Sequence, residues 1–230
     1  MGNRGEGRFT KFPWFAARLY DRLTQEKAIR LQYTEVAQDL APRVSGGRLL
    51  DVGTGPGRFL LEIHKLKPGV QLHGLDISVS MVRLARRNLA GTPAEIRQGS
   101  IEQTEYQDEF FDVVTCMGSF YLWNNPERCL KEVFRILKAG QSAYLYETHR
   151  DCNVDEVWSA VREKLRDETL LRRILLPRFL RKQLKMTYST DEVEEIIGRT
   201  RFAKWYTLER ITLARLPAWL RISLTKPEMA

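Results

Sequence analysis

The chain has 230 residues, of which 43% are hydrophobic, and it carries a formal net charge of +8 at pH 7. This length and apolar content suffice for one sizeable core, so we expect a single domain. No stretch reaches the roughly 18 continuous apolar residues of a membrane span, and the first residues lack the apolar run of a signal peptide. We therefore expect a soluble, cytoplasmic protein.

Cysteine and histidine usage argues against two further classes. The three cysteines and three histidines are scattered along the chain, and no CxxC pair occurs. This spacing predicts neither a disulfide framework nor a zinc site, and we expect no metal.

The positive charge is concentrated in residues 169–186, which hold six basic residues and no acidic one. Four interpretations compete: a lid that meets an anionic small molecule, an interfacial helix on anionic lipid, an RNA phosphate contact, and an ordinary amphipathic helix with a solvated basic face. Among the functional ones we favour the lid, because Phe179 is the only aromatic residue of the segment and single-strand binding favours interleaved aromatic residues. Arg172 and Arg173 are its candidate contacts.

The middle of the chain alternates strand-like and helix-like stretches, which predicts a parallel sheet covered by helices. Ser78 is expected to cap the second helix of this region, and Gly140 to close the helix that starts near Pro126. The expected strands are residues 48–52, 71–75, 94–98, 110–117 and 142–148.

The flanking regions follow other patterns. The pattern of residues 15–40 predicts one or two amphipathic helices. Residues 151–186 are expected to form a helical insertion broken at Pro177, followed by a short helix capped by Thr190. Two strand-like stretches with a turn at Pro217 then predict an antiparallel hairpin that completes the sheet. The single domain thus divides into a helical cap, a core, a helical insertion, and a last helix with a strand pair, at residues 1–44, 45–149, 150–189 and 190–230.

Between the first strand and the first core helix, "DVGTGPGRF" places glycines at Gly53, Gly55 and Gly57. This GxGxG spacing differs from the dinucleotide fingerprint GxGxxG, which would need glycine at Arg58. Glycines permit a sharp turn and a close ligand approach, the helix N-terminus favours an anionic group, and Asp76 at the next strand end can accept hydrogen bonds from ribose. The combination predicts a nucleoside ligand at the carboxyl ends of the strands, in one crevice with Ser100, Cys116 and Glu147.

Four stretches in order make the sequence resemble the class I S-adenosylmethionine-dependent methyltransferases, in particular the small-molecule group that includes ubiquinone and menaquinone biosynthesis enzymes. They are "LLDVGTGPGRF", "LHGLDISVSMVRLARRN", "RQGSIEQ" and "FDVVTCMGSFYLWNNPERCLKEVFRILKAGQ". The resemblance implies a Rossmann-like α/β sandwich with a mostly parallel seven-stranded sheet, an antiparallel C-terminal strand, an N-terminal helical cap and a helical lid after the fifth strand. It also implies S-adenosyl-L-methionine as cofactor and S-adenosyl-L-homocysteine as product.

The same resemblance assigns cofactor contacts to positions in this chain. Around the methionine part it implies Asp51, Gly53, Thr54, Gly55 and Gly57. Asp76 would hold the ribose, Ile77 would pack on adenine with Ile101 at its edge, Cys116 and Met117 would lie under the sulfonium, and Met81 and Ser100 complete the set. Ser100 stands where the family often has aspartate, and "CMGSFYLW" replaces the Asn/Asp-Pro-Pro-Tyr/Phe signature, which makes methylation of DNA bases or of glutamine a weaker expectation.

Methyl transfer from a sulfonium is an in-line displacement, so alignment can supply most of the acceleration. A general base is needed only if the acceptor must lose a proton, and His149 is the first candidate, with Glu147 second. Tyr20, Tyr121 and Trp123 are candidate pocket walls. The expected partner is a small-molecule acceptor, anionic or quinone-like, with peripheral membrane contact as a further option. The alternatives are an RNA-directed methyltransferase, a non-catalytic binding module that uses residues 169–186, and a nicotinamide-dependent oxidoreductase.

Overall fold

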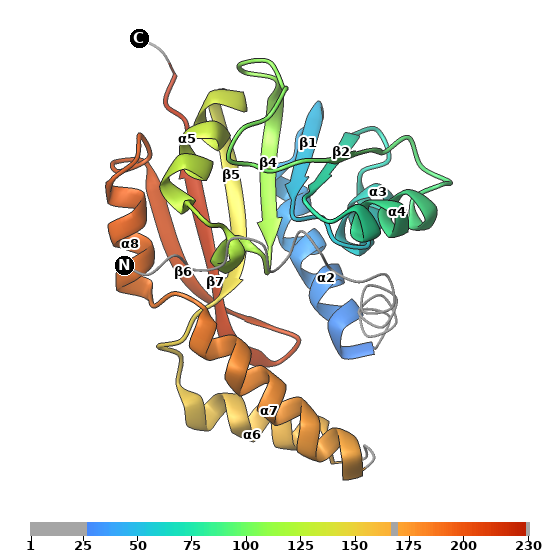
Figure 1. Cartoon of the computed structure of the whole chain (residues 1–230), viewed down its shortest axis with the longest axis vertical. Helices are drawn as coiled ribbons and strands as arrows, with labels where there is room; N and C mark the ends of the chain where they lie inside the picture. The colour runs from blue at the N-terminus through green and yellow to red at the C-terminus, as the bar shows by residue number, and fades with distance from the viewer. Residues whose placement is uncertain (1–26, 167–169, 229–230) are drawn as a thin grey trace.

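A computed structural model describes residues 27–166 and 170–228. Its centre is a seven-stranded sheet with the order β3-β2-β1-β4-β5-β7-β6 (Figure 1). Strand β7 runs antiparallel to its neighbours β5 and β6, and the other paired strands are parallel. This confirms the expected architecture. The strands are β1 (Arg48–Val52), β2 (Gln71–Asp76), β3 (Glu95–Gln98), β4 (Phe111–Met117), β5 (Leu137–Thr148), β6 (Tyr206–Leu213) and β7 (Leu216–Thr225).

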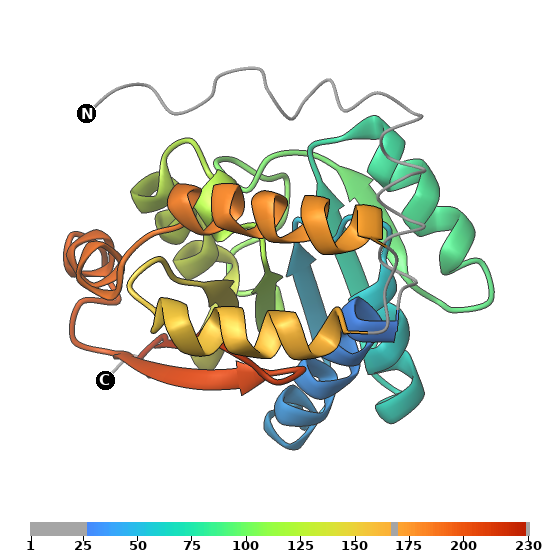
Figure 2. The ribbon, with the colours of Figure 1, turned by 90° about the horizontal axis from the view of Figure 1, so that it is seen from below.

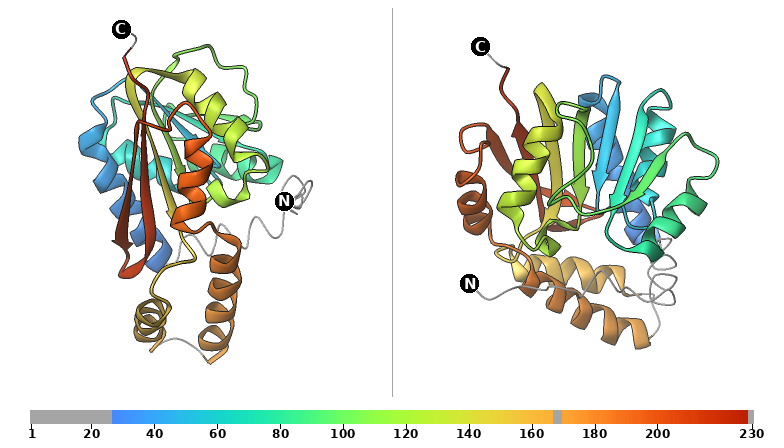
Figure 3. Two further views of the ribbon diagram at one scale, coloured as in Figure 1. Left: turned by 90° about the vertical axis from the view of Figure 1, so that its left-hand side faces the viewer. Right: turned by 45° about the horizontal axis from the view of Figure 1, so that its top comes forward.

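Helices cover both faces of this sheet, which explains why its central strands are apolar without interruption. In β1, Leu49 and Leu50 are both fully buried, although they point to opposite faces. Leu49 joins a cluster with helices α2 (Lys27–Leu40), α3 (Arg58–Leu66) and α4 (Val79–Asn88). Leu50 joins a cluster with α5 (Pro126–Ile136) and α8 (Thr190–Gly198). Figure 3 shows these two helical layers on either side of the sheet.

The helix caps agree with the sequence signals at one position and differ by a residue at another. The hydroxyl of Ser78 accepts the backbone N–H of Met81, as expected for the cap of α4. Helix α8 is capped by Ser189 instead of Thr190, because Ser189 and Glu192 form a reciprocal capping box.

Two expectations about chain breaks are wrong. Helix α5 ends at Ile136 and not near Gly140, because Leu137 is extended and pairs with Phe111 in the sheet. Gly140 has the left-handed φ of 74°, but it lies inside β5. Helix α7 (Leu170–Met186) runs through Pro177 without ending there. Pro177 lacks a backbone N–H and therefore costs the helix one hydrogen bond. The helix continues because Leu180 and Leu184 in the following turns pack against α6 (Val154–Lys164), and this packing stabilises those turns.

The C-terminal hairpin turns at Ala214 and Arg215 and not at Pro217. Both turn residues have positive φ, 46° and 61°, and the Glu35 carboxylate of α2 accepts the N–H of Ala214 at 2.6 Å. Pro217 lies inside β7. The β6–β7 pairing is irregular between Ile211 and Leu213, beside this turn, so the missing proline N–H is tolerated there.

Helices α6 and α7 form the expected insertion. They lie side by side across the edge of the sheet at which β4 and β5 end (Figures 1 and 2). Trp158 of α6 is buried in a small cluster with Ala218 of β7, which anchors the pair to the sheet. In the described residues no helix is long and apolar enough to cross a membrane.

Candidate functional site

The glycine turn between β1 and α3 is fastened to the end of β2. The N–H groups of Gly53 and Thr54 donate to the carbonyl oxygen of Leu75 at 2.8 and 3.1 Å. Gly53 has φ of 71°, and a Cβ at this position would lie 2.2 Å from the hydroxyl of Ser119. At Gly55, with φ of 52°, a Cβ would meet only the Gly53 carbonyl oxygen, at 4.0 Å. The turn is therefore packed on one side and open to close approach on the other.

Asp76, the last residue of β2, holds this turn through its carboxylate. One oxygen, Oδ2, accepts the N–H of Gly55 at 2.8 Å, and Oδ1 accepts the N–H of Ser78 at 2.8 Å. Burial raises the pKa of Asp76, while the two N–H donors act in the opposite direction. The neighbouring side chains of Ile77 and Val79 are apolar yet 39% and 41% exposed. A buried acceptor thus stands beside an open apolar surface.

Asp51 and Cys116 lie near the carboxyl ends of the adjacent central strands β1 and β4. The hydroxyl of Thr115 donates to Asp51 at 3.1 Å, and burial raises the pKa of the Asp51 carboxyl to about 7. The Cys116 sulfur lies 3.0 Å from the Ser119 hydroxyl, which donates to the carbonyl oxygen of Val52 at 3.1 Å. Burial, with Glu147 and Asp51 nearby, raises the pKa of the Cys116 thiol. Ser119 therefore connects the ends of β1 and β4.

Glu147 lies on β5, close enough to Cys116 to act on its thiol. Its side chain is 2% exposed, and its oxygens accept the N–H groups of Tyr121 at 3.4 Å and Thr148 at 2.9 Å. Burial raises the pKa of Glu147 to about 7, although these donors favour the charged form. The carboxyl thereby holds the short 3₁₀ helix η2 (Phe120–Leu122), which follows β4.

His149 has different surroundings. Its Nδ1 lies 2.8 Å from Asp151, whose carboxylate also accepts the N–H and hydroxyl of Thr190 at 3.1 and 2.9 Å and the guanidinium of Arg210 at 3.2 Å. Burial would raise the pKa of Asp151, but the hydrogen bonds with His149 and Thr190 lower it to about 2. His149 lines a cavity of about 310 Å³ with residues of α6, β6 and β7, and no residue of the glycine turn lines it. The structure therefore does not bring His149 together with the turn.

The remaining predicted residues occupy varied positions. Ile101 is buried in the same cluster as Cys116, and Met81 packs with Leu84. Ser100 bridges to Gln103 and accepts the N–H of Glu102 at 3.2 Å. Trp123 packs edge-on against Phe120, with ring centroids 5.1 Å apart. Thr54 and Gly57 lie in the turn, Met117 ends β4 and Tyr121 lies in η2, whereas Tyr20 and the side chains of Arg172 and Arg173 fall outside the described residues.

Three contact residues escaped the sequence analysis: Ser119, Thr115 and Asp151. Ser119 follows Gly118 directly after β4, so its place at a strand end was a usable signal. Asp151 acts through Thr190, which is 39 residues away in the chain, and no local pattern indicates that pairing. No group of three or more His, Cys, Asp or Glu side chains in the described part of the chain could hold a metal ion.

Comparisons with known proteins agree with this geometry. Residues 50–145 match a family model described as a methyltransferase domain. The chain is 32% identical over 108 residues to the uncharacterized methyltransferase YdaC of Bacillus subtilis. This alignment covers 47% of this chain and 60% of YdaC. It is 38% identical over 109 residues to the ubiquinone/menaquinone biosynthesis C-methyltransferase UbiE of Geobacter sulfurreducens. That alignment covers 44% of this chain and 42% of UbiE.

A solved structure extends the likeness to nearly the whole chain. The SAM-dependent methyltransferase from Aquifex aeolicus superposes with a TM-score of 0.66 at 16% identity, covering 91% of this chain and 98% of that one. The fold is thus that of the class I S-adenosylmethionine-dependent methyltransferases. The chain spans about half the length of the curated relatives it matches.

Proposed function

We propose that the protein is an S-adenosylmethionine-dependent methyltransferase that acts on a small organic acceptor. The observation that carries this proposal is the position of Asp76 between the glycine turn and an exposed apolar surface. The buried carboxylate of Asp76 faces the open glycine turn, and the exposed apolar side chains of Ile77 and Val79 stand next to it. A nucleoside needs this pairing of a ribose acceptor with an apolar surface for its base.

The residues present fit the cofactor. Gly55 leaves room for close approach to the backbone, and each Asp76 oxygen keeps acceptor capacity beyond its one backbone N–H. We assign the ribose to Asp76, the base to Ile77, and the methionine part to the turn from Asp51 to Gly57, with Thr54. Met81, Ser100, Ile101, Cys116 and Met117 remain proposed contacts around these groups.

When bound, S-adenosylmethionine supplies a methyl group that its sulfonium charge already activates. The chain then needs only to hold the two reactants in line and to exclude water. Alignment of this kind gives effective molarities on the order of 10⁵ M or more in well-oriented intramolecular reactions. The glycine turn and Asp76 fix one reactant. We assign the second to the side of the crevice formed by η2, with Tyr121 and Trp123, beneath the helical insertion.

Glu147 is the better placed of the two candidate bases. Its carboxyl is held beside η2, and its pKa of about 7 lets it exchange a proton near neutral pH. His149 stays a prediction, because its described contacts are with Asp151 and the cavity at β6 and β7. The UbiE relative, named for ubiquinone and menaquinone biosynthesis, favours a quinone-like or phenolic acceptor among small molecules.

A methyl-transfer assay tests the proposal. Purified protein with S-adenosylmethionine labelled in the methyl group is offered quinols, phenolic acids, amines and total RNA in separate reactions. We expect label in a quinol or phenol, and we expect Glu147→Gln to reduce turnover with an acceptor that must lose a proton. Label in RNA alone would replace the small-molecule proposal, and label in none of the four classes would contradict it.

A further inference from the structure

A second hollow lies inside the helical insertion, away from the glycine turn. It occupies about 670 Å³ between α6 and α7. This volume falls within the range of small-molecule sites. Its walls combine apolar side chains (Val154, Trp158, Leu184) with charged ones (Arg150, Asp155, Arg181, Lys185).

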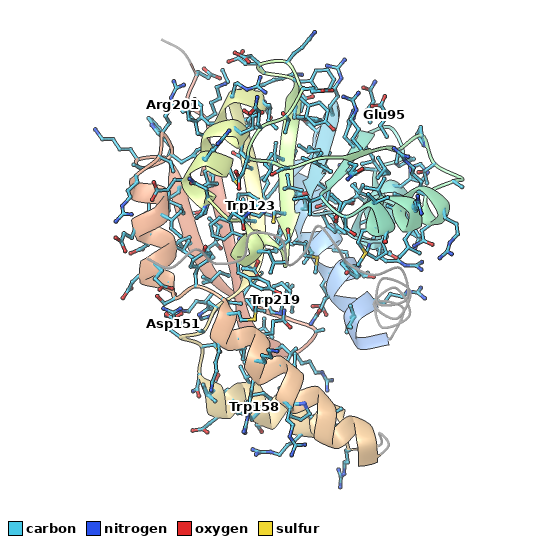
Figure 4. The ribbon with its side chains drawn as sticks, in the orientation of Figure 1. Glu95, Trp123, Asp151, Trp158, Arg201 and Trp219 are labelled. Atoms are coloured by element: carbon cyan, nitrogen blue, oxygen red, sulfur yellow. The ribbon has the colours of Figure 1, made fainter. Side chains whose placement is uncertain are left out.

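The apolar part of this groove is incompletely covered by the chain. Val154 is 49% exposed, although an aliphatic side chain gains free energy from burial. Trp158 lies between the two helices (Figure 4), and Leu184 faces it from α7. Trp158 itself is already buried, so an apolar group placed here would remove chiefly Val154 and the exposed part of Leu184 from water.

The charged part favours an anion. Arg150 is paired with Glu192 at 2.5 Å and donates to the carbonyl oxygen of Thr187 at 3.2 Å. The Arg181 guanidinium lies 4.8 Å from the ring centre of Trp158, over its face. Among the described residues neither Arg181 nor Lys185 has a carboxylate within ion-pair distance. Three basic side chains therefore line the groove against one acidic side chain, Asp155.

We propose that the α6–α7 groove binds an organic anion with an apolar body. The carboxylate or phosphate of the ligand pairs with Arg181 and Lys185, and its hydrocarbon or aromatic part covers Val154 and Leu184. The match of charge and of apolar surface carries the inference. Binding in this groove does not depend on methyl transfer, so it is measured without the methyl donor.

Isothermal titration with decanoate, kept below its micellar concentration, tests the site. We expect saturable one-to-one binding, and binding of decyltrimethylammonium that is weaker by about tenfold or more. The double variant Arg181→Gln/Lys185→Gln should weaken decanoate binding by about tenfold or more, since each cation contributes a charge-assisted contact. Val154→Ser should weaken it severalfold without a change in charge.

The matched control is Arg162→Gln/Lys182→Gln. It removes the same charge from exposed positions of the same two helices, outside the groove. We expect unchanged decanoate binding in this control. An equal loss in both double variants, or equal binding of the cationic probe, would overturn the proposal. Binding to phosphatidylglycerol vesicles without binding of monomeric decanoate would replace the small ligand with a membrane surface, and would equally overturn it.

Discussion

Replacing Glu147 by glutamine removes a carboxyl that the fold buries almost completely. The Glu147 side chain is 2% exposed, and burial raises its pKa from the usual 4.5 to about 7. Glutamine has nearly the same shape but carries no charge at any pH. The difference in unfolding free energy between the variant and the wild type therefore depends on pH through this one group.

The sign follows from the direction of the pKa shift. Well below pH 4.5 the carboxyl is protonated in both the folded and unfolded chains, and well above pH 7 it is ionised in both. Between these limits the wild type loses stability as pH rises, because the charged form is disfavoured in the buried site. The displacement from 4.5 to about 7 corresponds to about 3 kcal/mol. Relative to the wild type, Glu147→Gln should thus gain about 3 kcal/mol between pH 4.5 and pH 8.

Urea denaturation followed by circular dichroism at several pH values between 4.5 and 8 measures this difference. The matched control is Glu105→Gln, which removes an exposed carboxylate and should show no comparable trend. Glutamine offers one acceptor oxygen where Glu147 uses two, so a constant offset of about 1 kcal/mol is expected at every pH. A difference that stays flat across the range would refute the reasoning, because it would mean that Glu147 titrates alike in the folded and unfolded chains.

Two further substitutions test the packing of the site and its insertion. Gly53→Ala should lower the free energy of unfolding by about 1 to 3 kcal/mol, because φ is 71° and the new Cβ would lie 2.2 Å from the Ser119 hydroxyl. Adding Ser119→Gly should restore part of this loss. An unchanged midpoint of urea denaturation for Gly53→Ala would refute the clash. Asp151→Ala should lower stability by about 1 kcal/mol, allowing for its partial exposure, and should speed hydrogen exchange in α6 and α7 more than in α3. Because the pKa of Asp151 is lowered to about 2, its contribution to the free energy of unfolding should be present above about pH 4 and lost as pH falls toward 2. Equal hydrogen exchange in the variant and the wild type would contradict this role.

The sheet and the contact of Asp76 with the glycine turn were predictable because their signals are local. Strand β1 is apolar between glycines, the turn from Gly53 to Gly57 has a spacing of its own, and Asp76 ends the next apolar run. Parallel strands bring their carboxyl ends to one edge, so these short patterns were enough to place the residues together.

Most of the wrong expectations concern positions where distant contacts decide; the cap of α8 is the exception, because its Ser189–Glu192 capping box is local. The pairing of Leu137 with Phe111 ends α5 four residues before Gly140, and packing on α6 carries α7 through Pro177. The surroundings of His149 follow from Asp151 and its contact with Thr190, which no local pattern could indicate. Local propensity gives way where tertiary packing offers a larger gain in free energy.

Isothermal titration with S-adenosylhomocysteine tests the central claim most directly, since it needs no knowledge of the acceptor. We expect one-to-one binding to the wild type. Asp76→Asn should weaken it by about tenfold or more, because an amide replaces one acceptor oxygen with a donor. The exposed Asp191→Asn should bind as the wild type does, and circular dichroism checks that each variant is folded. Absence of saturable binding to the wild type, or tight binding of a reduced nicotinamide dinucleotide in its place, would contradict the account.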